Sequence, residues 1–316
     1  MSYSSLGTHR VVRATALVSA ALLSTSLLAL TGAASQGQAA PVPQQRAASS
    51  SLKVATYNVQ KDSLRSWKPR RAKVASLLRT GNADAFAIQE ANGPHKGSSL
   101  KFPARDLDNL LGPYTIVKTR IDRGTRQLST TGRYIFYKPA RLTPGRSGEM
   151  SLGGKQYAVW SEMTDRATGS RFMMVNAHLV NGNTAARDRV RRAQTRTLVA
   201  KTRTVNTAGL PLVVAGDFNT HRDHASDAPT KVLKQSGFVN SYDVAAKRVK
   251  SSYSSNNQLR RKPPRKYLHA DYVWVSRGTS VSRWSQAIRL RKGKFVGTIP
   301  SDHNPVFASI RLPYKR

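Results

Sequence analysis

The chain has 316 residues, 39% of them hydrophobic, so it can bury a substantial core as one large domain or two modest ones. With 52 Lys and Arg against 16 Asp and Glu, its formal net charge of +36 exceeds what solubility requires and is typical of a protein that binds a polyanion. Cysteine is absent, which excludes a disulfide framework, a cysteine nucleophile and a thiolate zinc site.

The first 40 residues are predicted to be a secretory signal peptide. His9, Arg10 and Arg13 precede an apolar stretch over residues 14–30, and small residues with a small-x-small cleavage pattern follow it. A single membrane anchor is the alternative, but hydroxyl side chains interrupt the stretch. No second apolar run approaches the length of a bilayer span, so we expect a secreted, extracellular protein without stable membrane insertion.

Residues 41–51 are rich in Pro, Gln, Ala and Ser and are expected to be a linker, with order beginning near Leu52. Beyond it, compact apolar runs alternate with polar connections. Their short length and their aromatic or β-branched content favour strands over helices. The predicted strands are residues 54–57, 85–88, 114–117, 134–137, 157–160, 172–175, 212–215, 272–275 and 306–310.

Two of the predicted helices are delimited by residues that commonly start and end helices. One covers residues 69–79, where Pro69 suits the first turn and Gly81 the end. The other is expected to begin at Ser226 as its cap and to end at Gly237.

A third helix is predicted over residues 185–201, with a buried face that carries Val190, Ala193 and Leu198. Residues 247–266 are expected to form an irregular basic loop. Because strands outnumber helices, the sequence favours two sheets packed on each other and covered by helices.

The positive charge is concentrated in a few segments. The predicted signal peptide holds two of the 52 basic residues and none of the 16 acids, so +34 remains after its removal. Nucleic acid is the leading candidate partner, because its phosphates release counterions on binding. General surface solvation and attraction to an anionic cell wall or membrane are the alternatives. The basic segments are residues 65–73, 187–196, 260–266 and 289–294.

Polar side chains that suit catalysis lie at the ends of predicted buried strands. Some of these residues follow a strand and others precede one. If the latter strands run antiparallel to the former, all these side chains meet at one edge of the sheets. The residues that follow a strand are Asn58, Glu90, His178, Asp217 and Asn219, and those that precede one are Asp271, Asp302 and His303.

Each of these residues also has a purely structural interpretation. Asn58 could cap a strand, Glu90 could be a surface carboxylate and His178 could be a half-buried histidine. The segment Gly216-Asp217-Phe218-Asn219 could be an Asx turn. Because all these residues occur together at strand ends, a separate structural role for each of them explains the pattern poorly.

The ordered set of motifs resembles the endonuclease/exonuclease/phosphatase superfamily over residues 52–312. The resemblance implies a single domain over residues 52–316, with the four-layer α/β/β/α sandwich of two packed, mainly antiparallel sheets found in deoxyribonuclease I. It also implies metal-assisted hydrolysis of a phosphate ester. The motifs are Thr56-Tyr57-Asn58-Val59-Gln60, Ile88-Gln89-Glu90, Asn176-Ala177-His178-Leu179, Gly216-Asp217-Phe218-Asn219, Ala270-Asp271-Tyr272 and Ser301-Asp302-His303.

The expected metal ligands are Asn58, Glu90 and Asp302. Their carboxylate and amide oxygens are hard donors of the kind that Mg²⁺ or Mn²⁺ accepts, with Ca²⁺ as a further candidate. The bound ion would neutralise charge that develops on the phosphate and the leaving oxygen.

The expected acid–base groups are two imidazoles and two carboxylates. His303 with Asp271 resembles the His–carboxylate pair of the family, and either His303 or Asp217 would accept a proton from the attacking water. The resemblance implies that Asn219 positions this water or a phosphate oxygen, and that His178 donates to a phosphate oxygen or assists the leaving group.

The chain departs from the family pattern at two places. Gln60 stands where relatives often carry an acid or glycine, and His269-Ala270 replaces Arg-Ile before the carboxylate at Asp271. A third motif, His221 to His224, could be a zinc-binding pair but has no obvious third ligand, so a surface loop is expected there.

The expected function is therefore that of a secreted, monomeric nuclease, most simply an endonuclease, that cuts DNA or RNA with little sequence preference. A sphingomyelinase-like phospholipid phosphodiesterase or another phosphatase of the superfamily is an alternative. The lipid enzyme would need an exposed apolar hairpin, and the sequence has no continuous patch of that kind. A non-catalytic basic protein that binds extracellular nucleic acid is an alternative of another class.

Overall fold

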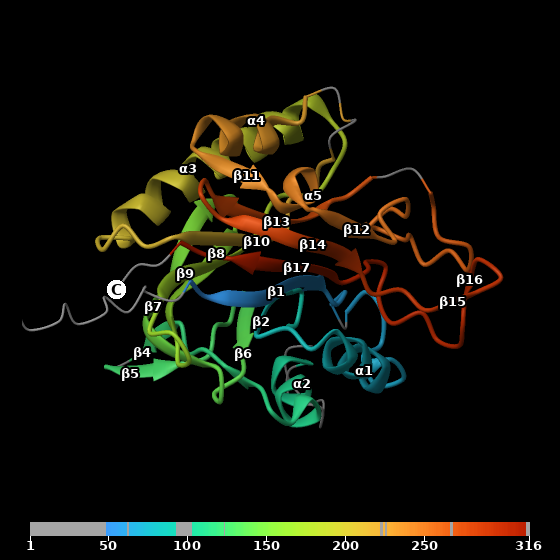
Figure 1. Cartoon of the computed structure of the whole chain (residues 1–316). Helices are drawn as coiled ribbons and strands as arrows, with labels where there is room; N and C mark the ends of the chain where they lie inside the picture. The colour runs from blue at the N-terminus through green and yellow to red at the C-terminus, as the bar shows by residue number, and fades with distance from the viewer. Residues whose placement is uncertain are drawn as a thin grey trace, which may run out of the picture. The chain divides into compact units, whose positions relative to one another are not determined.

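Two packed sheets form the centre of the protein in the computed structural model, which describes residues 49–61, 63–92, 103–122, 124–221, 224, 226–265 and 268–313 (Figure 1). The predicted signal peptide and most of the predicted linker lie outside the described residues. The strand β1 (Ser51–Asn58) begins within the predicted linker. Ser50, directly before it, is already buried, and its hydroxyl donates to Asp165 at 2.5 Å. Among the described residues, no helix is long and apolar enough to cross a bilayer.

Both sheets are mixed, with parallel and antiparallel neighbours. The pairs β1–β2, β9–β10 and β12–β14 are parallel and the other neighbours are antiparallel. The first sheet has the order β12 (Lys247–Val249), β14 (Ser280–Gln286), β17 (Val306–Arg311), β1, β2 (Ala85–Gln89), β6 (Tyr134–Tyr137), β3 (Thr115–Ile116). The second has the order β11 (Phe238–Asn240), β13 (Asp271–Ser276), β10 (Leu212–Asp217), β9 (Arg171–His178), β8 (Gln156–Asp165), β7 (Leu142–Gly153).

Three apolar clusters define the layers, because successive residues of a strand point to opposite faces. Val54 of β1 and Val213 of β10 belong to the core between the sheets. Ala55 packs outward with the helices α1 (Arg71–Gly81) and α2 (Pro103–Leu111).

Val214 packs on the opposite outer face with α3 (Ala185–Val205) and α4 (Ala228–Gln235), so helices cover both outer faces (Figure 1). The short helix α5 (Ser241–Val244) follows β11 directly. The predicted four-layer sandwich and all nine predicted strands are confirmed.

The buried face of α3 differs from the prediction. Val190 is 38% exposed, whereas Arg191 is fully buried and donates to the carbonyls of Val180 and Gly182. Arg191 also bonds Asp188 on the same helix. The hydrophobic pattern failed here because hydrogen-bonded polar side chains fill the buried face.

Two helix ends also differ. Helix α1 includes Gly81, where a Cβ would lie 2.1 Å from the ring of Phe307, and ends at Asn82 with φ of 51°. Helix α4 is capped by Asp227, because Ser226 instead donates to Asp188. Glycine at residue 81 is therefore required by close packing.

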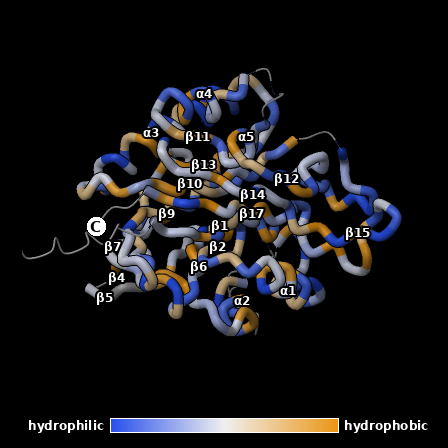
Figure 2. The backbone as a smooth tube through the Cα atoms, in the orientation of Figure 1, coloured by the Kyte–Doolittle hydropathy of each residue, from blue (hydrophilic) through white to orange (hydrophobic). Residues whose placement is uncertain are grey.

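Several elements were not predicted. They include β7, β14, α2 and two small hairpins, β4 (Arg120–Asp122) with β5 (Thr125–Gln127) and β15 (Leu290–Arg291) with β16 (Lys294–Phe295). Figure 2 shows the tip of the β15–β16 hairpin in the hydrophilic colour. Within residues 247–266, predicted to be irregular, the short strand β12 is present and Asn256 forms an isolated bridge with His303.

Candidate functional site

Strand polarity brings the predicted site residues to one edge of the two sheets. In the first sheet, Asn58 pairs with Gln89 across parallel strands, and β17 runs antiparallel to β1. In the second sheet, Asp217 pairs with His178 across parallel strands and with Asp271 across antiparallel strands. The expected antiparallel orientation of the strands after Asp271 and Asp302-His303 is confirmed.

A buried network joins the two sheets beneath this edge. The amide of Asn176 on β9 donates to the carbonyls of Ile88 and Tyr134 in the first sheet, each at 2.8 Å. Its oxygen accepts from Gln89 at 2.8 Å. Because both amides are fully buried, their paired hydrogen bonds fix how the sheets are aligned.

Asp217 lies at the centre of the site and is 1% exposed. One of its oxygens, Oδ2, lies 3.0 Å from Asn58 Nδ2, 3.6 Å from His178 Nε2 and 3.7 Å from His303 Nε2. Burial raises the pKa of Asp217, and Asp271 adds to this effect, while His303 and His178 oppose it. The carboxylate is therefore held among two imidazoles and an amide.

Gly216 makes this position of Asp217 possible. Its φ is +155°, and a Cβ there would lie 1.9 Å from the carbonyl oxygen of Ala177. Only glycine allows the two strands to approach this closely. Glycine at residue 216 therefore allows Asp217 to lie beside His178 on the neighbouring strand.

Glu90 directly follows β2 and has a positive φ of 60°. Its carboxylate accepts from Asn58 Nδ2 at 2.9 Å and from the backbone N–H of Lys61 at 3.0 Å. Burial favours a higher pKa, but the nearby His178 and these two donors outweigh it and lower the pKa of Glu90. The group is therefore held in its ionised form.

His303 and Asp271 form a buried pair, with Nδ1 and Oδ2 2.8 Å apart. Burial alone would lower the pKa of His303, but the carboxylates of Asp271 and Asp217 raise it well above its usual value, with Asp302 adding to the effect. The other oxygen of Asp271 has no hydrogen-bond partner among the described residues. The predicted His–carboxylate pair is thus brought together.

The buried group of Asp217, Asp271 and His303 could hold a metal ion, since its ligand atoms lie within 4.8 Å of one another. A neutral imidazole would offer Nε2 to such an ion. A protonated ring has no lone pair for a metal, and the two carboxylates favour the protonated form. A metal ion and a proton would therefore compete for Nε2 of His303.

Two of the three predicted metal ligands are joined through Ser301. Its hydroxyl donates to the backbone carbonyl of Asn58 at 2.7 Å and lies 3.2 Å from Asp302 Oδ1. The side-chain oxygen of Asn58 accepts from the N–H of Gln60 at 2.9 Å, while its nitrogen faces Glu90 and Asp217. Metal binding by Asn58, Glu90 and Asp302 stays a prediction.

His178 closes the site on the side of the second sheet. Its Nε2 lies 3.9 Å from Glu90 Oε1, and its backbone carbonyl accepts from Arg133 at 3.5 Å. Burial lowers the pKa of His178, against the opposing effect of Asp217. The ring is therefore favoured as neutral, with one N–H to donate.

Arg133 is a site residue that was not predicted. Burial lowers its pKa to about 10, although Glu90 and Asp217 oppose this shift. It directly precedes β6, whose Tyr134 pairs with Ile88 across antiparallel strands, so it lies at the same edge as Glu90. The rule of polar residues at strand ends applies to Arg133 as well, but one more Arg in a basic chain does not stand out.

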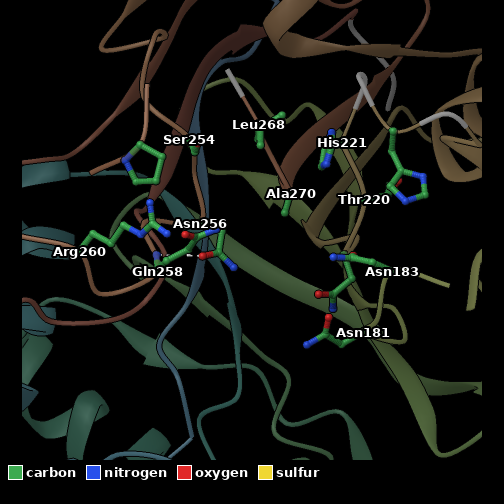
Figure 3. Close-up of a pocket in the computed structure, with 13 residues that line it drawn as sticks. Asn181, Asn183, Thr220, His221, Ser254, Asn256, Gln258, Arg260, Leu268 and Ala270 are labelled. Atoms are coloured by element: carbon green, nitrogen blue, oxygen red, sulfur yellow. Dashed lines mark hydrogen bonds between the residues drawn. The ribbon is translucent and has the colours of Figure 1, made fainter. Parts of the chain in front are cut away.

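A cavity of about 330 Å³ lies beside the reactive groups. Figure 3 shows Asn256, Gln258 and Arg260 on one side of it and Asn181 and Asn183 on the other. None of the described residues that line it is acidic. The remaining lining residues are Asn219, Thr220, His221, His224, Ser254, Pro264, Leu268 and Ala270.

Three residues singled out in the sequence, Asn219, His221 and His224, line this cavity. Asn219, with φ of 50°, donates its backbone N–H to Asp217 and its amide to the carbonyl of Leu179, each at 2.9 Å. His221 and His224 also line the cavity, with ring centroids 5.6 Å apart. The expected surface loop is therefore a cavity wall at these two histidines, whereas Arg222 and Asp223 lie outside the described residues.

Asn256 connects the cavity with the reactive centre and was not predicted. Its amide lies 3.4 Å from His303 Nε2, the nitrogen that also faces Asp217. The segment around it had no recognisable motif, so no sequence signal identified it.

Comparisons with known proteins agree with this geometry. A family model described as "Endonuclease/Exonuclease/phosphatase family" matches residues 55–303. No curated protein sequence matches the chain.

Solved structures of related fold cover most of the chain. A family protein from Bacteroides thetaiotaomicron has a TM-score of 0.67 at 20% identity and covers 85% of this chain and 100% of that one. A mannosyl-6-phosphatase from the same organism has a TM-score of 0.65 at 20% identity, with 82% and 99% covered. TDP2 from D. rerio, complexed with a single-strand DNA product, has a TM-score of 0.58 at 14% identity, with 83% and 99% covered.

These structures share the fold, and the family model spans most of the chain. The protein belongs to the endonuclease/exonuclease/phosphatase family and is a phosphoesterase of that family with a buried Asp/His site.

Proposed function

We propose that the protein is a secreted, metal-dependent phosphodiesterase that hydrolyses nucleic acid with little sequence preference. The observation that carries this choice of substrate is the formal charge, +36 for the whole chain and +34 without the predicted signal peptide. A surface of this kind attracts the phosphate backbone, which is the part of nucleic acid that does not depend on sequence.

The pairing of the carboxylates within the protein supports this proposal. Glu162 pairs with Arg146 and Arg171, and Asp165 pairs with Arg141. Glu90 and Asp217 are committed to the site. Because the chain has 52 Lys and Arg against only 16 acids, many lysines and arginines are available to bind phosphate.

The oxygen donors on the Glu90 side fit a hard divalent cation. Glu90 is held ionised, and the side-chain oxygen of Gln60 is buried without a hydrogen-bond partner among the described residues. Glu90, Asp302 and Asn58 would hold Mg²⁺ or Mn²⁺, which when bound would neutralise charge on the phosphate and polarise it.

The side chains on the other side of the site would move protons. Cationic His303, oriented by Asp271, would donate its Nε2–H to a phosphate oxygen, and Asp217 would accept the proton of the attacking water. Neutral His178 would donate an N–H toward the leaving oxygen. Asn219 would position the water, since its backbone N–H already contacts Asp217.

The test is turnover of supercoiled plasmid and of RNA with Mg²⁺ or EDTA, with Asp217→Asn as the inactive control. We expect metal-dependent nicking that Asp217→Asn loses. Cleavage of sphingomyelin but not of nucleic acid would overturn the proposal, and so would binding of DNA without turnover of any substrate. Nicking against end-trimming of the plasmid distinguishes endonuclease from exonuclease action.

A phosphomonoesterase acting on a small polyhydroxylated substrate is the second candidate. The cavity favours it, because five amide side chains and no acid are found among the described lining residues, and amides hydrogen-bond hydroxyl groups well. The mannosyl-6-phosphatase of similar fold provides the probe. If mannose 6-phosphate is hydrolysed with a higher kcat/KM than a DNA phosphodiester, the second candidate replaces the first.

A further inference from the structure

We propose that residues 256–265 and residues 287–297 together form a basic arm that binds the phosphodiester backbone of the substrate beyond the phosphate that is cut. The proposal rests on the nuclease function proposed above. It adds a second binding surface, which determines how firmly a long polyanion is held.

Charge distinguishes the basic arm from the rest of the surface. Its two segments contain eight Lys or Arg and no Asp or Glu, and all eight are exposed. Among the described carboxylates, none pairs with any of these eight cations. Elsewhere, by contrast, described arginines such as Arg71 and Arg141 pair with Asp106 and Asp165.

The outer part of the basic arm is the β15–β16 hairpin. Its turn residues Lys292 and Gly293 have φ of 51° and 73°, the positive values that a tight two-residue hairpin turn requires. Phe295 is 9% exposed and anchors the hairpin, while Arg291 and Lys294 are exposed. The hairpin therefore presents cations at its tip.

The hairpin is fixed to the first segment of the basic arm. The backbone N–H of Phe295 donates to the carbonyl of Arg261 at 2.8 Å. The guanidinium of Arg261 donates in return to the carbonyls of Phe295 and Gly297, at 3.2 and 2.5 Å. These hydrogen bonds join two segments that are distant in the sequence into one surface.

The first segment is in turn fixed to the reactive centre. Asn257 donates its backbone N–H to the carbonyl of Asp302 at 2.6 Å and its amide to that of Ser301 at 2.9 Å. Its neighbour Asn256 contacts His303, and Arg260 lines the cavity opposite Asn181 (Figure 3). Cations therefore continue outward from the site of hydrolysis without an intervening carboxylate in either segment.

The composition of the basic arm favours nucleic acid over a lipid surface. Insertion into a bilayer needs a continuous apolar patch. The large hydrophobic side chains exposed on the basic arm are Leu259, 37% exposed and next to Arg260, and Val296, 40% exposed, whose backbone N–H donates to the carbonyl of Arg289. The hairpin therefore lacks the apolar composition that a lipid-binding hairpin would need.

The test compares two triple variants that remove the same number of charges. The arm variant is Arg289→Gln, Arg291→Gln and Lys294→Gln. The control variant is Arg277→Gln, Arg283→Gln and Arg311→Gln. These three arginines are exposed and lie outside the basic arm: Arg277 directly follows β13, Arg283 is on β14 and Arg311 ends β17. Binding to duplex DNA is measured in EDTA from about 50 to about 300 mM salt, a range over which phosphate contacts weaken strongly. In parallel, kcat/KM is measured for plasmid and for bis(p-nitrophenyl) phosphate.

Each phosphate contact is worth up to about eightfold in affinity at about 0.1 M salt, so the loss of one to three contacts should weaken DNA binding by roughly 8- to 500-fold. The slope of log affinity against log salt should decrease in magnitude by up to about 2.7. The ratio of kcat/KM for plasmid to that for the small diester should fall in the arm variant only.

The outcomes separate this proposal from the nuclease function. If the arm and control variants bind DNA equally well and with equal salt slopes, the basic arm is refuted even if plasmid is cut. If the arm variant loses binding to phosphatidylserine vesicles but not to DNA, the basic arm is a membrane contact and the proposal fails. If the protein cuts no nucleic acid but the arm variant still loses DNA binding, the nuclease function fails, and the basic arm stands only as a DNA-binding surface and not as part of a substrate site.

Discussion

Replacing Asp271 with asparagine tests whether the carboxylate beside His303 is required for turnover. The Asp271→Asn substitution would keep the volume and the polar contact, but it would remove the negative charge 2.8 Å from the ring. His303 would then lose the group that orients it and favours its cation. Folding should survive, because without this carboxylate the buried ring of His303 can release its proton and become neutral, so that no buried charge is left unpaired.

The size of the effect follows from the hydrogen bond that is lost. A charge-assisted hydrogen bond is worth about 1.5–3 kcal/mol. If the cation of His303 stabilises the transition state, this corresponds to a loss of roughly 10- to 150-fold in kcat, because each ~1.36 kcal/mol is about a factor of ten. The KM for DNA should change little, since phosphate contacts elsewhere hold the substrate.

The matched control is Asp165→Asn, which also replaces a buried carboxylate that accepts several hydrogen bonds, including one from Arg141 at 2.9 Å. It lies at the end of β8 away from the site, because β8 runs antiparallel to β9. Initial rates of plasmid nicking are measured with Mg²⁺, and the folded fraction is checked by circular dichroism. A folded Asp271→Asn variant with kcat within about threefold of the parent would refute the reasoning, as would an equal loss in the control.

Three further substitutions test the structure around the site by chemical denaturation. Gly216→Ala should lower the free energy of unfolding by more than about 2 kcal/mol, because its Cβ would meet the carbonyl of Ala177; a variant as stable as the parent would contradict that contact. Arg191→Met should cost about 3–5 kcal/mol by breaking a buried ion pair, and a loss below about 1 kcal/mol would show that the polar face of α3 is dispensable. Burial raises the pKa of Asp227, so the stability that this carboxyl contributes is present at acid pH and is lost as pH rises through its folded pKa. Asp227→Asn, which keeps a capping side chain, should therefore gain stability relative to the parent between acid and neutral pH, and a constant difference would exclude the shift.

The site residues that could be predicted from the sequence are those at the ends of predicted strands, because the direction of each strand decides which of its ends lies at the site. Asn58 and Glu90 could be placed together because both follow buried strands, and Asp271 because it precedes one. Arg133 obeys the same rule, but basic residues are so common in this chain that one more at the start of a strand does not stand out as a site residue. Arg191 was misjudged for a different reason: a buried guanidinium is stable only through its carbonyl partners, and these partners cannot be located from the spacing of apolar residues.

The joining of distant loops was beyond prediction for a third reason. Residues 260–266 and 289–294 were recognised as separate basic segments, but a backbone hydrogen bond between Phe295 and Arg261 joins them. Nearly every residue offers such a bond, so sequence patterns do not specify which ones form. The position of Asn256 beside His303 depends on the same loop geometry.

The site is divided between the two sheets, so its geometry depends on how they pack. The first sheet supplies Glu90 and Asn58, while the second supplies Asp217 and Asp271. Among the reactive side chains, the hydrogen bonds from Asn58 to Asp217 at 3.0 Å and between His303 and Asp271 at 2.8 Å cross from one sheet to the other.

Neither contact would survive a slip of one sheet over the other by a single residue, about 3.3 Å. The buried amide pair of Asn176 and Gln89 opposes such a slip directly below the site, because a displaced sheet would leave several buried polar groups without partners at a cost of about 1–3 kcal/mol each. The buried amide pair therefore affects the reaction through alignment, because it keeps the expected metal ligands of one sheet facing the proton-transfer groups of the other.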